Sequence, residues 1–190
     1  MMDQDSRDIL LRSQKGDKEA FCQLVSRHQS YAFGLALRLL HDEQDAEDVV
    51  QDAFLRVWDH IGDFNPENKF TTWLYTIVSN LCLDRLRRKK RWNKLSSRAE
   101  DSLDREAVPG IPQPEEIHAN RELVQIIKRL MLHLSPKQRL VFARRDFEEC
   151  SIQETSAITG MSEGSVKSNL CYARRHIREM LASGYDLKGL

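Results

Sequence analysis

A run of basic residues beside tryptophan and asparagine is the part of this sequence best suited to binding nucleic acid. Residues 85–98 hold eight basic and no acidic side chains. Upstream of this run, Trp73, Asn80 and Arg87 follow one another at intervals of seven residues, so they lie along one side of a helix. Arginine and lysine neutralise phosphates, an aromatic ring stacks on unpaired bases, and an amide reads a base edge. The pattern predicts binding to single-stranded or melted nucleic acid, and the alternative is a solvated helix end.

A stripe of polar and apolar side chains on an acidic helix is suited to binding another protein. Four residues within the predicted helix 43–60 repeat at the spacing of one helix face and flank its buried side: Asp48, Gln51, Leu55 and Trp58. A leucine and a tryptophan bordered by carboxylates have the composition of an interface with an apolar centre and a polar rim. The alternative is that Leu55 and Trp58 only widen the buried face.

Residues 151–182 predict a helix-turn-helix. Ser151 and Glu154 form a capping box, and Gly160 supplies the left-handed backbone that ends the first helix. Ser162 then caps a second helix, whose polar face carries Lys167, Ser168, Tyr172 and Arg175. The second helix of such a motif enters the major groove of DNA. The alternative is a pair of packed helices with a solvated polar face.

Strand signals are nearly absent, so the sequence predicts an all-α protein of two small helical domains joined by a flexible linker. The first domain covers residues 6–95 and the second covers residues 119–183. The linker, residues 96–118, is acidic, contains three of the five prolines and shows no apolar period. The expected helices are one that Asp17 caps and that begins at Lys18, then 31–40, 43–60, one capped by Thr71 or Thr72 and running to about Arg91, then 119–134, 135–147, 151–159 and 162–182.

The formal net charge is zero, but the charges are unevenly distributed along the chain. Residues 1–84 hold 8 basic and 15 acidic side chains, in contrast to the basic run that follows. A neutral protein of this kind can offer surfaces of opposite sign to different partners. We therefore expect carboxylates and cations to be sorted onto separate patches.

The composition favours a cytoplasmic protein that is not an enzyme. The sequence shows neither a signal peptide nor an apolar run long enough to span a bilayer. The four cysteines form no C-x-x-C pair and the six histidines do not cluster, so no metal or cofactor is expected. No phosphate-binding loop, zinc-protease motif or nucleophile elbow occurs. A conventional helix-turn-helix regulator is the competing class, although residues 1–95 lack the α/β pattern of a receiver domain.

Three segments together resemble the extracytoplasmic-function (ECF) sigma factors of bacteria: DAEDVVQDAFLRVW (Asp45–Trp58), KFTTWLYTIVSNLCLDRLRRKKR (Lys69–Arg91) and the stretch Leu134–Leu181. The resemblance implies two helical domains, called regions 2 and 4, that bind the RNA polymerase core and direct it to promoters. It also implies an anti-sigma factor that holds the protein inactive. The linker would run toward the RNA exit path of the polymerase.

The resemblance assigns roles to individual residues. The surface that would dock on the clamp helices of the polymerase β′ subunit comprises Asp45, Asp48, Gln51, Asp52, Leu55 and Trp58. The residues that would engage the melted −10 element, with one base held out of the stack, are Phe64, Trp73, Asn80, Arg85, Arg87, Arg88 and Arg91. The residues that would read the duplex −35 element, near a contact with the β flap, are Ser162, Ser165, Lys167, Ser168, Cys171, Tyr172, Arg174 and Arg175.

The recognition helix departs from the family at several positions. Asn169, Cys171 and Tyr172 stand where arginine or histidine is frequent in the family. The resemblance therefore implies placement of this helix in the groove without implying a particular −35 sequence.

Overall fold

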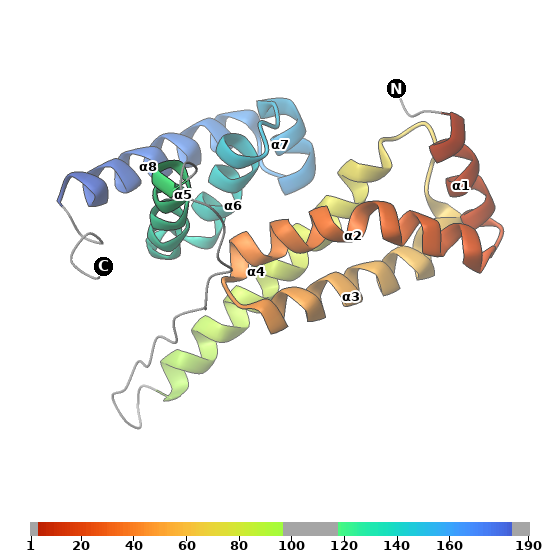
Figure 1. Cartoon of the computed structure of the whole chain (residues 1–190), viewed down its shortest axis with the longest axis horizontal. Helices are drawn as coiled ribbons and strands as arrows, with labels where there is room; N and C mark the ends of the chain where they lie inside the picture. The colour runs from red at the N-terminus through yellow and green to blue at the C-terminus, as the bar shows by residue number, and fades with distance from the viewer. Residues whose placement is uncertain (1–3, 97–117, 184–190) are drawn as a thin grey trace.

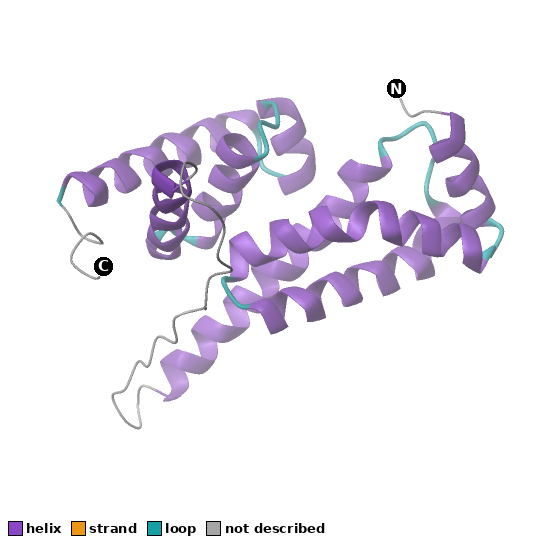
Figure 2. Cartoon of the chain, viewed as in Figure 1, coloured by secondary structure: helices purple, strands orange, loops and turns teal. Residues whose placement is uncertain are grey.

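The computed structural model describes residues 4–96 and 118–183, and this part of the chain contains helices and no strand (Figures 1 and 2). The all-α prediction is confirmed. The first group of helices is α1 (Gln4–Gln14), α2 (Lys18–Leu40), α3 (Glu43–His60), the short turn η1 (Ile61–Asp63) and α4 (Phe70–Ser96). The second group is α5 (His118–Leu130), η3 (Met131–His133), α6 (Pro136–Phe142), η4 (Ala143–Phe147), α7 (Ile152–Thr159) and α8 (Glu163–Ala182). Nearly all of the predicted linker, residues 97–117, lies outside the described residues.

The first group is built around α2, α3 and α4, which pack against one another (Figure 1). The Asp17 side chain accepts hydrogen bonds from the N–H groups of Glu19 and Ala20, so Asp17 caps α2 as predicted. His41 ends α2 with a φ of 57°, a left-handed conformation that reverses the chain direction. Asp42 then caps α3 by accepting from the N–H of Asp45. This tight connection sets α2 and α3 side by side and antiparallel.

One helix of the first group was not predicted, and the predicted cap of another is wrong. The helix α1 was not predicted, and its buried residues are Ile9, Leu10 and Ser13. The helix α4 begins at Phe70, so Thr71 and Thr72 lie inside its first turn and do not cap it. Phe70 is 2% exposed, and burying its ring in the core draws the helix start back to that residue.

The second group confirms the predicted capping signals. Ser135 and Gln138 form a capping box with Pro136 in the first turn of α6, and Ser151 and Glu154 form another at the start of α7. Gly160 ends α7 with a φ of 66°, a conformation that glycine adopts without steric cost. The α-helices here are shorter than expected, since α5 tightens into η3 after Leu130 and α6 widens into the π-helical turn η4 after Phe142.

Acid is expected to destabilise the protein through its helix caps. The pKa of Asp42 is lowered by the hydrogen bond from the N–H of Asp45, and Lys89 adds to this effect. The pKa of Glu154 is likewise lowered by the N–H of Ser151. Because the folded pKa of such a carboxyl lies below its unfolded value of about 4, each carboxylate stabilises the fold above that pH, and its contribution is lost as the pH falls through the folded pKa.

The measurement is the thermal midpoint of unfolding followed from about pH 5 to about pH 3. An Asp42→Asn variant keeps a side-chain oxygen for the cap but cannot titrate, so its midpoint should fall less steeply than that of the wild type. Identical slopes for the two proteins would show that the Asp42 cap contributes nothing to acid unfolding.

Candidate protein and nucleic-acid interfaces

An apolar groove lies between α2 and α3 and contains the predicted protein-binding residues. Its volume is about 640 Å³, and its lining includes Phe21, Val25, Phe33, Val50, Phe54, Leu55 and Trp58, with Glu43, Glu47 and Gln51 among the polar members. Leu55 is 57% exposed, so it does not simply widen the core. Trp58 is partly buried and packs edge-on against Phe21, with ring centroids 4.8 Å apart. Beyond the groove, Asp48 and Asp52 are exposed on the same helix.

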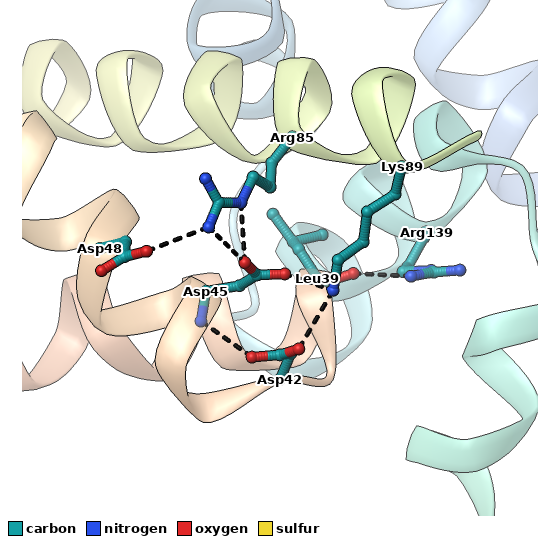
Figure 3. A network of polar contacts seen from close by, with 7 residues as sticks. All are labelled: Leu39, Asp42, Asp45, Asp48, Arg85, Lys89 and Arg139. Carbon is teal, nitrogen blue, oxygen red and sulfur yellow. Dashed lines mark hydrogen bonds and ion pairs between the residues drawn. The ribbon is translucent and has the colours of Figure 1, made fainter. Parts of the chain in front are cut away.

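The acidic start of α3 is ion-paired to the basic part of α4 (Figure 3). The guanidinium of Arg85 donates from Nε to Asp45 Oδ1 over 2.7 Å and from Nη2 to Asp48 Oδ2 over 3.0 Å. The Nζ of Lys89 lies 3.1 Å from Asp42 Oδ2 and is also paired with Asp45. The expectation that opposite charges are sorted onto separate patches is wrong at this junction. Asp45 is only 7% exposed, and a buried carboxylate requires cations beside it.

The aromatic residues predicted to bind the −10 element lie together at the loop between η1 and α4. The Phe64 ring stacks on Trp73 with centroids 4.8 Å apart and an interplanar angle of 26°. Phe64 itself is 8% exposed, so its ring supports Trp73 from beneath more than it faces solvent. A cavity of about 570 Å³ opens beside this pair, and it is lined by His60, Asp63, Phe64, Asn65, Asn68, Lys69, Thr72 and Trp73.

The side chain that fixes this loop was missed by the sequence analysis. Gln14, at the end of α1, donates from Nε2 to the carbonyl oxygen of Phe64 over 2.6 Å and to that of Ile61 over 2.9 Å. Nearly fifty residues separate these partners in the chain, so no local signal points to the pairing. Through Gln14, α1 therefore helps to position the loop beside Trp73.

The remaining predicted −10 residues are spread along the exposed side of α4. Asn80 is exposed, and so are Arg87, Arg88 and Arg91. Arg87 pairs with Asp84 over 2.9 Å, an exposed pair within one helix that contributes little stability. Arg85 differs from these arginines, because it faces α3 and is engaged there by carboxylates.

The predicted recognition helix α8 presents the expected polar face. Ser162 caps it by accepting from the N–H of Ser165 over 3.3 Å. The apolar side faces inward through Val166, Leu170, Ala173, Ile177 and Met180, and the polar residues Lys167, Ser168, Cys171, Tyr172, Arg174 and Arg175 are exposed.

Two of the arginines on α8 are already in contact with other side chains. The Arg175 guanidinium lies over the Tyr172 ring, 5.0 Å from its centroid. Arg174 donates through Nε and Nη2 to the carboxylate of Asp146, at 3.1 and 2.6 Å from Oδ1. Lys167 and Ser168 lie on the exposed face between the cap and these arginines.

Two features are absent from the ranges that the structure describes, 4–96 and 118–183. Within them, no group of three or more histidine, cysteine, aspartate or glutamate side chains is arranged to hold a metal ion. Among the helices of the same ranges, none is long and apolar enough to cross a membrane.

Comparison with known proteins identifies the two groups of helices. The family model of sigma-70 region 2 matches residues 24–92, and that of sigma-70 region 4 matches residues 124–177. The chain is 32% identical over 171 residues to the ECF RNA polymerase sigma factor SigW of Bacillus subtilis, covering 88% of this chain and 91% of SigW. It is also 32% identical over 182 residues to the ECF sigma-E factor of Escherichia coli strain K12, covering 93% of this chain and 95% of that protein.

Solved structures share the fold. The structure of CnrH in complex with the cytosolic domain of CnrY matches with a TM-score of 0.66 and 23% identity, over 95% of this chain and 99% of that chain. The sigma factor RpoE of Bartonella quintana, solved with the anti-sigma factor NepR, matches with a TM-score of 0.69 and 23% identity, over 85% of this chain and 96% of that chain. The sequence identities to full-length relatives and the two matched regions together decide the assignment: the chain belongs to the ECF family of RNA polymerase sigma factors, which are not enzymes but the subunits that bind the polymerase core and direct it to promoters.

Proposed function

We propose that the groove between α2 and α3, with the carboxylates along α3, is where this sigma factor binds the polymerase core. The contact residues on the clamp helices of β′ would be Asp48, Gln51, Asp52, Leu55 and Trp58. The observation that carries this proposal is Leu55, a large apolar side chain left 57% exposed at the edge of an apolar groove. Asp45 would act from behind this surface, because its buried carboxylate is bound to Arg85 and Lys89.

The second part of the proposal concerns the −10 element. The Phe64–Trp73 stack borders a cavity lined by amides and a lysine, a composition that suits an unpaired base held out of the stack. Asn80 would read a base edge, and Arg87, Arg88 and Arg91 would bind the strand's phosphates. Arg85 could join them only by leaving its carboxylate partners on α3.

The third part concerns the −35 element and the division of the chain. The exposed face of α8, from Ser162 to Arg175, would enter the major groove of duplex DNA. On this face, the hydroxyl groups of Ser165 and Ser168 would approach the bases or phosphates, and so would the side chains of Cys171 and Tyr172. Domains covering residues 6–95 and 119–183 would carry these two activities, joined by a linker over residues 96–118.

An anti-sigma factor is the further protein partner that we propose. The RpoE structure of the same fold was solved with one, NepR. In this chain the apolar groove between α2 and α3 offers such a partner a surface that overlaps the proposed polymerase contact, so the two proteins would compete. Polymerase and promoter are both cytoplasmic in bacteria, and we place the protein there on that ground.

Lys167→Ala is expected to weaken binding to a −35 duplex at every sequence tested. Lys167 is exposed on α8 and would neutralise one phosphate, so its loss should reduce the slope of log affinity against log salt by about 1. The measurement is duplex binding by the full chain in complex with polymerase core, as a salt titration. Lys15→Ala, an equal charge loss in the turn after α1, is the control. An unchanged slope for Lys167→Ala would remove this residue from the DNA contact.

The direct test of the proposed function is transcription by polymerase core reconstituted with the purified protein. A library of promoter fragments should yield start sites preceded by shared −10 and −35 sequences. Core polymerase alone should give no such enrichment, and core with a Leu55→Arg variant should give less of it than core with the same concentration of wild-type protein. Start sites that are the same with and without the protein would contradict the proposal.

A further inference from the structure

We propose that the second group of helices is latched to the first by a buried polar contact, and that this closed form must open before the protein can use both promoter elements. The latch is formed by Arg139, which lies in α6, by Glu148, which follows η4, and by their partners on α2. Around it, α7 packs along α4 and α6 contacts both α2 and α4. The requirement to open rests on the proposed function, whereas the latch itself does not.

Glu148 is the centre of the first half of the latch. Its side chain is 3% exposed and is paired with Arg38 of α2 and with Arg144 of its own domain. The hydroxyl of Tyr31, also on α2, donates to Glu148 Oε2 over 2.6 Å. Arg144 lies 5.2 Å from the centroid of the Tyr75 ring on α4, and Tyr75 in turn stacks on Tyr31 with centroids 4.5 Å apart. Side chains from α2, from α4, and from η4 and the residue that follows it thus form one closed cluster.

Arg139 forms the second half of the latch by reaching the end of α2. The Nη1 of this guanidinium donates to the carbonyl oxygen of Leu39 over 2.6 Å, as Figure 3 shows. The last carbonyl groups of a helix lack partners within it and carry partial negative charge, so a cation there is favourable. Arg139 also donates to the carbonyls of Met131 and Leu132, at 2.9 and 2.8 Å, which fixes its position within the second group. Burial lowers its pKa to about 10, so it stays charged at neutral pH.

The polar side chains of this contact are typical of an interface between domains that can move apart. Permanent interfaces resemble apolar cores, whereas contacts between domains that move are more polar. A buried arginine–glutamate pair gains little over two hydrated ions, because desolvation offsets most of the attraction. Water can therefore replace the partners of Glu148 and Arg139 at modest cost when the domains part. The exposed pair between Lys69 and Glu154, at 3.3 Å, adds little.

Closure is incompatible with simultaneous reading of two distant promoter elements. Lys69 lines the cavity beside Trp73, and Glu154 lies on α7, directly before the recognition helix. Their contact shows that the two proposed DNA-reading elements lie next to each other in the closed form. Elements at −10 and −35 are centred about 25 base pairs apart, which is about 85 Å along B-form DNA. The latch must therefore release in the promoter complex, and it would keep the free protein from engaging promoters.

Arg38→Glu tests the latch directly, because it places a carboxylate against Glu148 while leaving the Glu148–Arg144 pair intact. Small-angle X-ray scattering of the full chain should show a larger radius of gyration for this variant than for the wild type. Lys15→Glu, the same charge change in an exposed turn away from the contact, should match the wild type. Tyr31→Phe removes only the hydroxyl that donates to Glu148, so its radius of gyration should lie between those of the wild type and Arg38→Glu. This milder variant keeps the test decisive if Arg38→Glu fails to fold. Equal radii for all four proteins would overturn the latch.

The inhibitory role of the latch has its own measurement. If the closed form is favoured tenfold, Arg38→Glu should bind the polymerase core about tenfold more tightly than the wild type, because the cost of opening is removed. An expanded Arg38→Glu variant with wild-type affinity for core would overturn the inhibitory role. If no variant, wild type included, bound the core, the proposed function itself would be contradicted, while scattering would still decide whether the latch exists.

Discussion

Leu55→Arg is expected to lower the affinity of the protein for the RNA polymerase core by about 30-fold or more, the effect of losing about 2 kcal/mol at an interface hot spot. Leu55 is 57% exposed on α3 and borders the groove, so its burial against a partner would remove apolar surface from water. Arginine at this position would bring an unpaired charge into that contact. The measurement is equilibrium binding of the labelled protein to core enzyme.

The choice of Leu55 over Trp58 follows from their packing. Trp58 is in contact with Phe21 across the α2–α3 interface, so truncating it would loosen the bundle as well as any docking surface. Leu11 supplies a matched control, since it is 39% exposed on α1 and lies outside the groove. Leu11→Arg should bind core with wild-type affinity and unfold at a similar temperature. Equal losses for the two arginine variants would mean that the effect arises from the stability of the fold.

The local chemistry of this chain could be predicted from the sequence because it depends on near neighbours. Asp17, Ser135, Ser151 and Ser162 each cap a helix within three residues of their partner, and Gly160 adopts the left-handed turn that its position requires. The apolar period of residues 43–60 likewise follows from one helix alone. These signals were enough to predict an all-α chain with a helix-turn-helix at its end.

Contacts between helices that are distant in sequence could not be predicted in this way. Periodicity shows which face of a helix is buried but not which helix covers it. The basic run and the acidic helix therefore looked like separate surfaces, although Arg85 and Lys89 pair with Asp45. Glu148, which lies 117 residues from Tyr31, gave no sign of its buried position.

At the candidate site, too, the sequence predicted local features but not long-range contacts. The residue types around Trp73 predicted a stacking surface, and the ring of Phe64 does stack on Trp73. What the pattern could not show is that Phe64 lies beneath the surface, held there because Gln14 binds the backbone of its loop. Spacing identifies candidate side chains, whereas their exposure depends on long-range packing. Asn80, exposed and without a core role, is therefore a sharper probe of DNA reading than either aromatic residue.

Asn80→Ala is expected to reduce promoter opening by about 30-fold, the discrimination of about 2 kcal/mol that an amide provides at a base edge. Asn80 is exposed on α4 in line with Trp73 and Arg87, so its truncation leaves the packing of the helix unchanged. Polymerase core carrying the variant should still bind duplex promoter DNA, because the phosphate contacts proposed for α8 and for the arginines on α4 do not involve this amide. The measurement is permanganate reactivity of unpaired thymines at −10, compared with the footprint at −35.

The matched control for Asn80 is Gln23→Ala, which removes an exposed amide from α2 outside the groove and the cavity. It should open promoters at the wild-type rate. If Asn80→Ala lost the −35 footprint together with opening, its defect would lie in general binding, and α4 would not read the melted strand through this amide. A selective loss at −10 would instead tie strand opening to one side chain on the face that also carries Trp73, and would separate that step from the duplex binding proposed for α8.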